Sequence, residues 1–428
     1  VQLLSRPDGW LGKDFEWVVG AYYVDGEGGF ENIFLRPASD LVGIVTDPII
    51  DQLPIDSPLR DTLLDVLDPL STAGEPNVLA RGAVGTESLS GFAQATWFAT
   101  DWLNLTLGGR YQDEDRFLTF ADTSVFLVSP DANRGPGAVP TGVTIPLFNY
   151  ELQKSNSKNF SSKAVISVTP EDGKLVYLSR STGFKSATYN VINIYSPPSF
   201  VRPEEVTSYE LGFKADFFGS ALRLNSAIFR NEIKDKQAAF VSLISGGAVA
   251  LLNAERATIN GAEFDMTLLP FIDSNPGFAL TANGAYLDAK YDKYSDGRGF
   301  GEFDGIYRQG QDFSGQKIER TPKFSGSVGA NQVFEAGSDG EAEFGLDLYH
   351  NSGFYFSAEN KDNYRQDAYT LLNGRLSYLY MPWDVRVTVF GKNLTNEFYR
   401  VALFETDFGI LSTRAYERQY GLTVDWKF

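Results

Sequence analysis

The end of the chain decides the fold, and it reads Tyr420-Gly421-Leu422-Thr423-Val424-Asp425-Trp426-Lys427-Phe428. Every second residue, counted back from the terminal Phe428, is apolar, and the residues between them are Lys, Asp, Thr and Gly. In a β-strand this period of two places the side chains of Tyr420, Leu422, Val424, Trp426 and Phe428 on one face. The segment is therefore predicted to be a strand that meets an apolar medium on one side and water on the other.

The same alternation recurs along the chain. It is clear in residues 103–112, 208–217, 221–228, 261–268 and 341–348. A soluble β-sandwich also alternates, but it buries its apolar faces against each other. Here the polar face carries charges on strand after strand, which favours water on that side and lipid on the other. We therefore predict an all-β fold, a transmembrane antiparallel β-barrel, over a soluble sandwich.

Composition narrows the function classes. The chain has 428 residues, 14% of them aromatic, with no cysteine and a net charge of −18. Such an acidic chain lacks the electrostatic footprint of a nucleic-acid-binding protein. The absence of cysteine excludes disulfides, thiolate metal sites and cysteine nucleophiles in this chain. No run of about 18 apolar residues is present, so a spanning helix is not predicted.

About fifteen strands can be assigned from the alternation and the turn residues. Their connections alternate between short and long, which is typical of barrels with short periplasmic turns and long extracellular loops. The predicted strands lie near residues 1–6, 15–30, 87–100, 103–122, 148–170, 174–190, 204–219, 221–237, 255–270, 277–294, 322–337, 340–357, 367–381, 383–400 and 417–428.

The largest predicted extracellular loops lie near residues 31–86, 123–147, 238–254 and 295–321. The first contains a possible helical turn at 61–67, whose leucines could equally pack the loop on itself. Residues 238–251 are apolar for a loop, so we expect an extra hairpin there that turns at Gly246-Gly247.

Three stretches resemble the C-terminal barrel portion of TonB-dependent outer-membrane receptors, especially siderophore receptors. Residues 178–190 contain Gly183-Phe184-Lys185-Ser186, residues 204–214 contain Tyr209-Glu210-Leu211-Gly212, and residues 391–399 read Gly-Lys-Asn-Leu-Thr-Asn-Glu-Phe-Tyr. The resemblance covers about 174–428 and includes the terminal Phe428. It implies that the alternating C-terminal strand is the family's barrel-assembly signal.

This resemblance implies active import of a scarce solute across the outer membrane of a Gram-negative bacterium. The first expectation is a ferric siderophore, with glycan, cobalamin or aromatic compounds left open. The TonB–ExbB–ExbD complex would supply energy through an N-terminal plug. Plugged transporters of this class have 22 strands, so the plug and the remaining strands should come from the same precursor or from a second chain. The start at Val1, without a signal peptide, agrees with an upstream part.

Charged residues on the polar face form the main chemical feature. They would line a path for a polar solute, or they would form salt bridges with neighbouring strands and a plug. The predicted lumen-facing residues are Arg110, Glu210, Lys214, Arg223, Glu263, Asp265, Glu343, Asp347, Arg375 and Arg386.

The predicted loops are rich in aromatic residues and arginines. Such side chains suit a bulky ligand with rings and anionic groups, although an aromatic girdle and self-packed loops would need the same residues. The candidate ligand-binding residues are Arg36, Tyr189, Tyr195, Arg202, Phe240, Tyr307, Arg308, Tyr355, Tyr364, Arg365 and Phe404.

Catalytic and metal chemistry find little support. The single histidine, His350, stands beside Asn351 and Ser352 and is interpreted as a polar residue near a strand end. One histidine cannot build a His-based metal site, and no cofactor is expected. The acidic run Asp113-Glu114-Asp115 lacks the spacing of a calcium loop and is interpreted as strand-rim charge. The alternatives to active import are a passive pore and a structural barrel in an envelope assembly.

Overall fold

The protein is almost entirely β-structure. The computed structural model describes residues 1–5, 14–35, 75–128, 142–191, 198–241, 249–300, 307–406 and 409–427. Within these ranges, no helix is long and apolar enough to cross a membrane. Two short 3-10 turns with described bounds, η3 (Asp362–Tyr364) and η4 (Met381–Trp383), interrupt the strands. The all-β prediction is confirmed.

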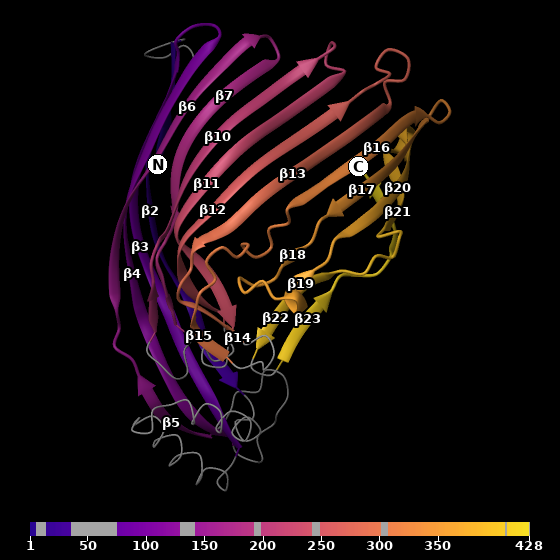
Figure 1. Ribbon diagram of the computed structural model, residues 1–428. Coiled ribbons are helices and arrows are strands. Elements are labelled where there is room, and N and C mark those ends of the chain that lie inside the picture. Colours follow the sequence, from indigo (N-terminus) through magenta and orange to yellow (C-terminus); the bar gives the residue numbers. More distant parts are fainter. Residues whose placement is uncertain are drawn as a thin grey trace.

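Fifteen strands follow one another in a single antiparallel sheet, which we call the wall (Figure 1). This number matches the sequence prediction. The strands of the wall, in order, are β1 (Gln2–Leu4), β2 (Phe15–Leu35), β3 (Glu75–Phe98), β4 (Leu103–Val128), β6 (Lys154–Glu171), β7 (Lys174–Lys185), β10 (Glu204–Phe217), β11 (Leu222–Val241), β12 (Val249–Leu268), β13 (Phe278–Lys293), β16 (Phe324–Glu335), β17 (Gly340–Asn351), β20 (Tyr369–Tyr380), β21 (Val385–Lys392) and β24 (Gln419–Trp426).

Each wall strand pairs with the wall strands that come next to it in chain order. The connections between them are alternately short turns and long segments. The turn between β6 and β7 shows the short kind: Gly173 adopts φ of 76°, which a residue without Cβ reaches without steric cost. At another short turn, Asp384 takes the left-handed conformation after η4. The long connections gather at the opposite end of the sheet, the lower end in Figure 1.

Several strand boundaries differ from the sequence prediction. β3 begins at Glu75 rather than near 87, and β4 continues to Val128, because these two strands pair far beyond their alternating segments. Residues 142–149 form β5 (Gly142–Asn149), which pairs with the far end of β4, so the strand predicted from 148 begins at Lys154. Backbone pairing extends strands where periodicity gives no signal.

The predicted hairpin at 238–251 is present as an extension of β11 and β12. The two strands remain paired as far as Val241 and Val249. The expected turn at Gly246-Gly247 and the possible helical turn at 61–67 both lie outside the described residues.

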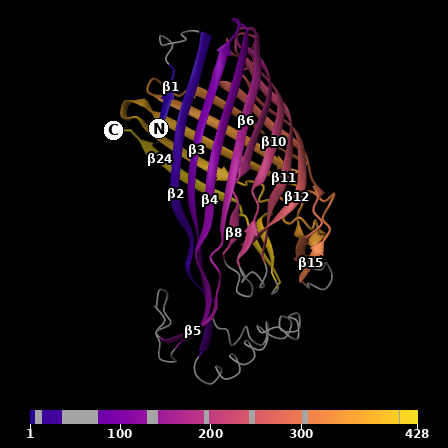
Figure 2. The ribbon, with the colours of Figure 1, turned by 90° about the vertical axis from the view of Figure 1, so that its left-hand side faces the viewer.

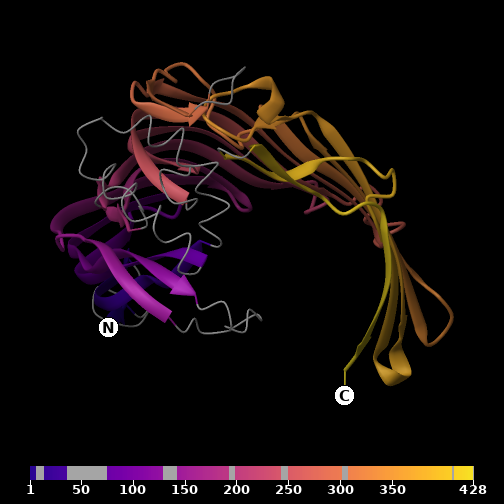
Figure 3. The same cartoon turned by 90° about the horizontal axis from the view of Figure 1, so that it is seen from below.

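The wall is an open, curved sheet in the described part of the chain. β1 and β24 are its two end strands, and Figure 3 shows the N- and C-termini at separate edges of the arc. Figure 2 shows the same sheet with the N-terminal strands β2, β3 and β4 in front. Unpaired backbone groups at such edges are costly in lipid, at several kcal/mol each. Further strands are therefore needed to close this sheet in a membrane.

Short hairpins at the long-connection end form a second structural unit, which we call the connection layer. Its strands are β14 (Gly297–Phe300), β15 (Tyr307–Gln311), β18 (Phe354–Tyr355), β19 (Arg365–Gln366), β22 (Arg400–Thr406) and β23 (Gly409–Arg414), together with segments 312–323 and 356–364. A further hairpin, β8 (Thr188–Asn190) with β9 (Ser199–Val201), lies between β7 and β10.

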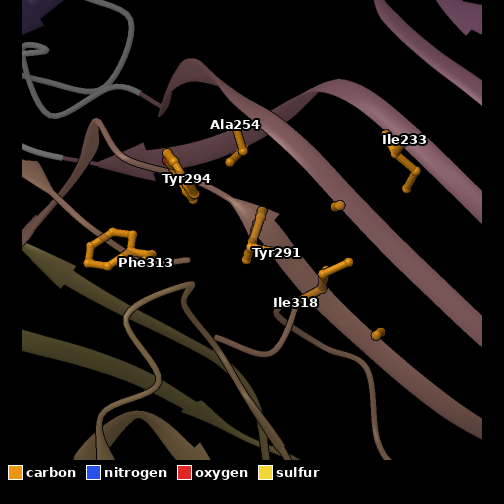
Figure 4. Packing of buried hydrophobic residues seen from close by; sticks show 9 residues of the cluster. Ile233, Ala254, Tyr291, Tyr294, Phe313 and Ile318 are labelled. Carbon is orange, nitrogen blue, oxygen red and sulfur yellow. The ribbon is translucent and has the colours of Figure 1, made fainter. Parts of the chain in front are cut away.

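The hydrophobic core sits where the connection layer meets the wall, not within the wall. Tyr291 is fully buried there, and its ring packs against Tyr294 at 5.0 Å between centroids, while Tyr294 meets Phe313 edge-on at 5.4 Å (Figure 4). Ile233 and Ile318 belong to the same cluster. Segment 312–323 is thereby packed onto the outer parts of β11, β12 and β13.

Candidate functional site

The strand register sorts the side chains of the wall onto two faces. One continuous row of cross-strand partners runs Lys214, Asn225, Asp265, Asn283, Ser327 and Tyr349, from β10 to β17. A neighbouring row on the opposite face runs Leu178, Leu211, Ile228, Ala262, Tyr286 and Phe324. We call these the charged face and the apolar face.

All ten predicted lumen-facing residues fall on the charged face. Cross-strand partners share a face, and so do residues two apart on one strand, so the strand register connects these residues across the wall. The set is Arg110 on β4, Glu210 and Lys214 on β10, Arg223 on β11, Glu263 and Asp265 on β12, Glu343 and Asp347 on β17, Arg375 on β20 and Arg386 on β21.

A depression of about 490 Å³ lies in the centre of the charged face. Lys214, Glu263 and Asp265 line it, together with Asn225, Asn283, Tyr177 and Tyr349. The Tyr177 hydroxyl donates a hydrogen bond of 2.5 Å to Glu210, and the Lys214 ammonium lies 6.0 Å from the Tyr177 ring centroid. Two carboxylates and one ammonium line the depression, and Glu210 lies behind its Tyr177, so the depression suits a polar or cationic group.

The remaining predicted charges are largely paired with one another. The Arg375 guanidinium contacts Glu343 at 2.8 Å and Asp347 at 3.7 Å, and Arg386 contacts the same Glu343 at 3.2 Å. Arg223 pairs with Asp216 at 2.8 Å. Exposed pairs of this kind contribute only about 0–1 kcal/mol each, so their main effect is to fix side-chain geometry along the wall.

Arg110 belongs to a separate polar chain on β3 and β4. Its guanidinium donates to Ser90 at 2.8 Å and to Gln112 at 3.4 Å, and Gln112 donates to Glu114 at 2.9 Å. Glu114 is 3% exposed and pairs with Arg116 at 3.0 Å. The predicted acidic rim is therefore divided between faces: Asp113 and Asp115 point to the side opposite Glu114, where they meet Lys158 and Lys154.

The apolar face presents large hydrophobic side chains to the outside of the sheet. Leu211 is 46% exposed and Ile228 58% exposed. The apolar residues of the C-terminal strand follow the same rule. Those that the structure describes, Tyr420, Leu422, Val424 and Trp426, are all exposed, and they stand on the face opposite Arg386 and Asp425. Phe428 lies outside the described residues. A face this apolar and this exposed requires lipid contact.

Two of the predicted ligand-binding residues are buried within the protein. Tyr189, 5% exposed, packs with Val84 and Leu118 and lies 5.3 Å from the Phe200 ring. Tyr364, 1% exposed, packs with Phe356 and Leu403. Both rings stabilise the packing of connections against neighbouring strands. Neither presents a free ring to solvent.

The other predicted ligand-binding residues are scattered over the long-connection end. Tyr355 and Arg365 are brought together as cross-strand partners of β18 and β19. The Arg202 guanidinium pairs with the Asp235 carboxylate at 2.6 Å. The Phe240 ring centroid lies 5.5 Å from the Arg298 guanidinium. Phe404, on β22, is 47% exposed. Arg308 lies on β15, which begins at Tyr307, whose side chain is not described. Arg36 and Tyr195 lie outside the described residues.

Residues that the sequence analysis did not single out complete the depression. Asn225 and Asn283 occupy charged-face positions of their strands, and counting residues along each strand was the signal available for them. Tyr177 and Tyr349 gave no such signal, because an aromatic residue in an alternating strand fits either face.

The single histidine lies on the apolar face near a strand end. His350 Nδ1 is 2.9 Å from the Thr370 hydroxyl, and the imidazole lies 6.2 Å from the Phe324 ring. Within the described ranges, no group of three or more His, Cys, Asp or Glu residues is arranged to hold a metal ion. His350 is thus a hydrogen-bonded residue of the strand end, as interpreted from the sequence.

Comparison with known proteins agrees with this geometry. The family model described as "TonB dependent receptor-like, beta-barrel" matches residues 42–394, which is most of the chain. The chain therefore belongs to the TonB-dependent receptor family, whose barrels lie in the outer membrane of Gram-negative bacteria. It is a receptor barrel rather than an enzyme.

Solved structures share the fold. The ferric yersiniabactin uptake receptor FyuA from Yersinia pestis matches with a TM-score of 0.67 and 16% identity, over 99% of this chain and 52% of that one. The siderophore receptor PiuA from Acinetobacter baumannii gives a TM-score of 0.61 and 17% identity, over 97% and 53%. The copper transporter OprC gives 0.58 and 14%, over 97% and 54%. The chain thus spans about half the length of these receptors.

Proposed function

We propose that this chain supplies the wall and the solute-binding connections of an active importer in the outer membrane. One observation carries the proposal: a charged face and an apolar face lie back to back on every spanning strand of a family-matched sheet. The apolar face meets lipid, and the charged face lines a hydrated interior. The solute enters at the long-connection end, which would face the cell exterior.

A plug would occupy the interior next to the depression. Glu210, Glu263 and Asp265 outnumber Lys214 there, so a basic side chain of a plug would be attracted electrostatically. The plug and the remaining strands come from another part of the same precursor or from a second chain. The TonB–ExbB–ExbD complex would pull on the plug and supply the energy for passage.

We propose a ferric siderophore as the solute, because one structural neighbour is named a siderophore receptor and another a ferric yersiniabactin uptake receptor. The exposed Phe404 ring supplies an aromatic contact for a chelate with rings, and the half-exposed Arg202 guanidinium, beside Asp235, supplies a cationic contact for anionic oxygens. A third neighbour is named a copper transporter, which keeps metal uptake in general as the broader class.

The test is uptake of radiolabelled iron by cells that carry the intact receptor, with and without TonB. Active import predicts accumulation of ferric chelates that is lost when TonB is deleted and retained when only the lipid-facing Val328 is changed to Leu. Passage that continues without TonB would favour a passive pore. A receptor that is correctly inserted but takes up no ferric chelate would contradict the siderophore assignment while leaving the wall intact.

A further inference from the structure

We propose that the apolar face carries a binding site for a phosphorylated lipid of the outer leaflet, at the rim where β13, β16 and β17 enter the connection layer. The site has two parts. A basic hollow receives the phosphate, and an apolar groove directly below it receives an acyl chain. The proposal depends on the outer-membrane setting and on the orientation of the long connections, and it does not depend on which solute is imported.

The basic hollow has a volume of about 320 Å³. Lys317, Lys323 and Arg365 line it, and Asp288 is its one carboxylate. That carboxylate is already paired with Lys290, at 3.0 Å. The hollow therefore has a net positive charge, which suits an anion.

Neither lysine of the hollow is neutralised by a carboxylate within the described residues. The Lys317 ammonium lies 5.8 Å from the Tyr355 ring centroid, and the Lys323 ammonium lies 5.7 Å from that of Tyr286. Arg365 has only a long contact of 3.6 Å with the highly exposed Asp367. Two lysines of β6 on the same face do have carboxylate partners. Lys154 forms an ion pair with Asp115, and Lys158 forms one with Asp113.

The apolar groove has a volume of about 590 Å³. Leu211, Ile228, Ala262, Tyr286 and Phe324 line it. The two parts meet at one contact, because Lys323 of the hollow stands over the Tyr286 ring of the groove. Long cationic side chains at such a boundary keep their charge in the headgroup region while their stems cover apolar surface.

The register supports placing this boundary at the edge of the membrane. On β11, Ile228 is followed on the same face by Arg230 and then Glu232. On β12 the corresponding partners are Ala262, Asn260 and Thr258, and on β13 they are Tyr286, Asp288 and Lys290. The face changes from apolar to charged within one row, so the hollow lies at headgroup height.

A phosphomonoester headgroup fits these observations better than a zwitterionic one. It carries about −1.5 to −2 charges at neutral pH and offers three acceptor oxygens. Two ammonium groups and one guanidinium supply donors for all three, and charge-assisted hydrogen bonds of this kind are stronger than neutral ones. A choline headgroup would place a cation against three cations.

The experiment is native mass spectrometry of the intact receptor, titrated in detergent with dioleoyl phosphatidic acid, dioleoyl phosphatidylcholine or inorganic phosphate. The test variant is Lys317→Ala/Lys323→Ala. The matched control is Lys154→Ala/Lys158→Ala, which removes two lysines from the same face at carboxylate-paired positions. Lys317→Arg/Lys323→Arg keeps both charges and reports on folding.

We expect the test variant to bind phosphatidic acid roughly a hundredfold more weakly, about tenfold for each lost ammonium. The control and the arginine variant should bind within threefold of the unmodified receptor. Ala262→Trp, which fills the groove, should weaken phosphatidic acid binding and leave inorganic phosphate binding unchanged.

Three results would overturn the proposal. If the test and control variants bind phosphatidic acid equally well, the hollow does not bind the lipid. If the receptor binds phosphatidylcholine as tightly as phosphatidic acid, the site has no specificity for a phosphomonoester. Inorganic phosphate that binds as tightly as the lipid would assign the hollow to a soluble anion instead.

Discussion

The wall and the connection layer bury their side chains in different media. In the wall, large apolar residues such as Ile228 and Val328, each 58% exposed, have no protein cover and depend on lipid. Where the connection layer packs on the wall, Tyr291 of β13 is 0% exposed, and within the layer Tyr364 is 1% exposed. Two lysines, Lys236 of β11 and Lys361 of the layer, are enclosed with carboxylates. The lipid-facing part of the wall is therefore stabilised by its surroundings, whereas the layer is stabilised by packing within the protein.

The two lysine clusters, one between β11 and segment 312–323 and one within the layer, differ in their charge balance. Lys236 faces one carboxylate, Glu319, at 3.1 Å, and that carboxylate also accepts a hydrogen bond of 2.6 Å from Tyr291. Lys361 faces two carboxylates, Glu359 and Glu405, the second at 3.3 Å. Its ammonium also donates to the Phe300 carbonyl. One cluster is balanced, and the other has one negative charge in excess.

This difference appears in the pKa values of the acids. Burial raises the pKa of Glu319, but the charge of Lys236 and the Tyr291 hydrogen bond outweigh burial and hold the pKa below its ordinary value. For Glu359, burial outweighs the effect of Lys361 and raises the pKa. Burial likewise raises the pKa of Glu405, and the nearby Glu359 adds to it.

The largest predicted effect comes from the unbalanced cluster. Lys361→Ala leaves Glu359 and Glu405 without their counter-ion in a buried site, which should lower the free energy of unfolding by about 3–5 kcal/mol. Denaturant titration of the intact receptor in lipid vesicles measures this loss. Lys290→Ala, at an exposed ion pair, is the control. A loss no larger than that of the control would show that the cluster does not stabilise the layer.

The second prediction tests the two faces of the wall at adjacent residues. Val328→Arg places a charge against lipid and should cost about 2–4 kcal/mol if the residue lies near the bilayer midplane. Ser327→Arg, one residue earlier on the charged face, should cost little. Unfolding in vesicles compares the two variants. Equal costs would mean that the faces are not in different media.

The third prediction concerns the balanced cluster. Tyr291→Phe removes the hydrogen bond to the charged Glu319 and should cost about 1.5–3 kcal/mol. Tyr209→Phe, at a 41% exposed ring of the wall, is the matched control and should change stability little. If both variants unfold at the same denaturant concentration, the hydrogen bond does not contribute.

The smallest predicted effect is opposite pH dependence of the two clusters. An acid with a raised pKa in the folded state holds its proton longer than in the unfolded state, so its region gains stability as pH falls towards the ordinary carboxyl pKa. Around Glu319 the sign is reversed: stability is present above the ordinary carboxyl pKa and is lost as pH falls below it.

Hydrogen exchange of the intact receptor, corrected for intrinsic rates, measures both regions. Between pH 7.5 and pH 5, peptides around 359–366 should become more protected, while peptides around 316–323 should stay unchanged. Glu405→Gln should reduce the first change. Identical pH profiles in the two regions would contradict the assignment.

The wall was predictable from sequence because the alternation of apolar and polar residues along a strand reflects lipid on one face and water on the other. The positions of Glu210, Asp265 and Arg386 on one face followed from counting residues along each strand. The connection layer was not predictable in the same way. The aromatic content of the loops predicts Tyr364 and Tyr189 as ligand contacts, yet tertiary packing buries both, because periodicity contains no information about contacts between distant loops.

The most direct test of the account is a cysteine scan of 324–335, which uses the absence of cysteine from this chain. Each single-cysteine receptor would be spin-labelled in outer-membrane lipid, and its accessibility to oxygen and to a water-soluble nickel complex would be measured. We expect a period of two, with oxygen favoured at Phe324, Val328 and Ala330 and nickel at Ser325, Ser327 and Gly329. Uniform accessibility along the strand would contradict a wall with lipid on one face and water on the other.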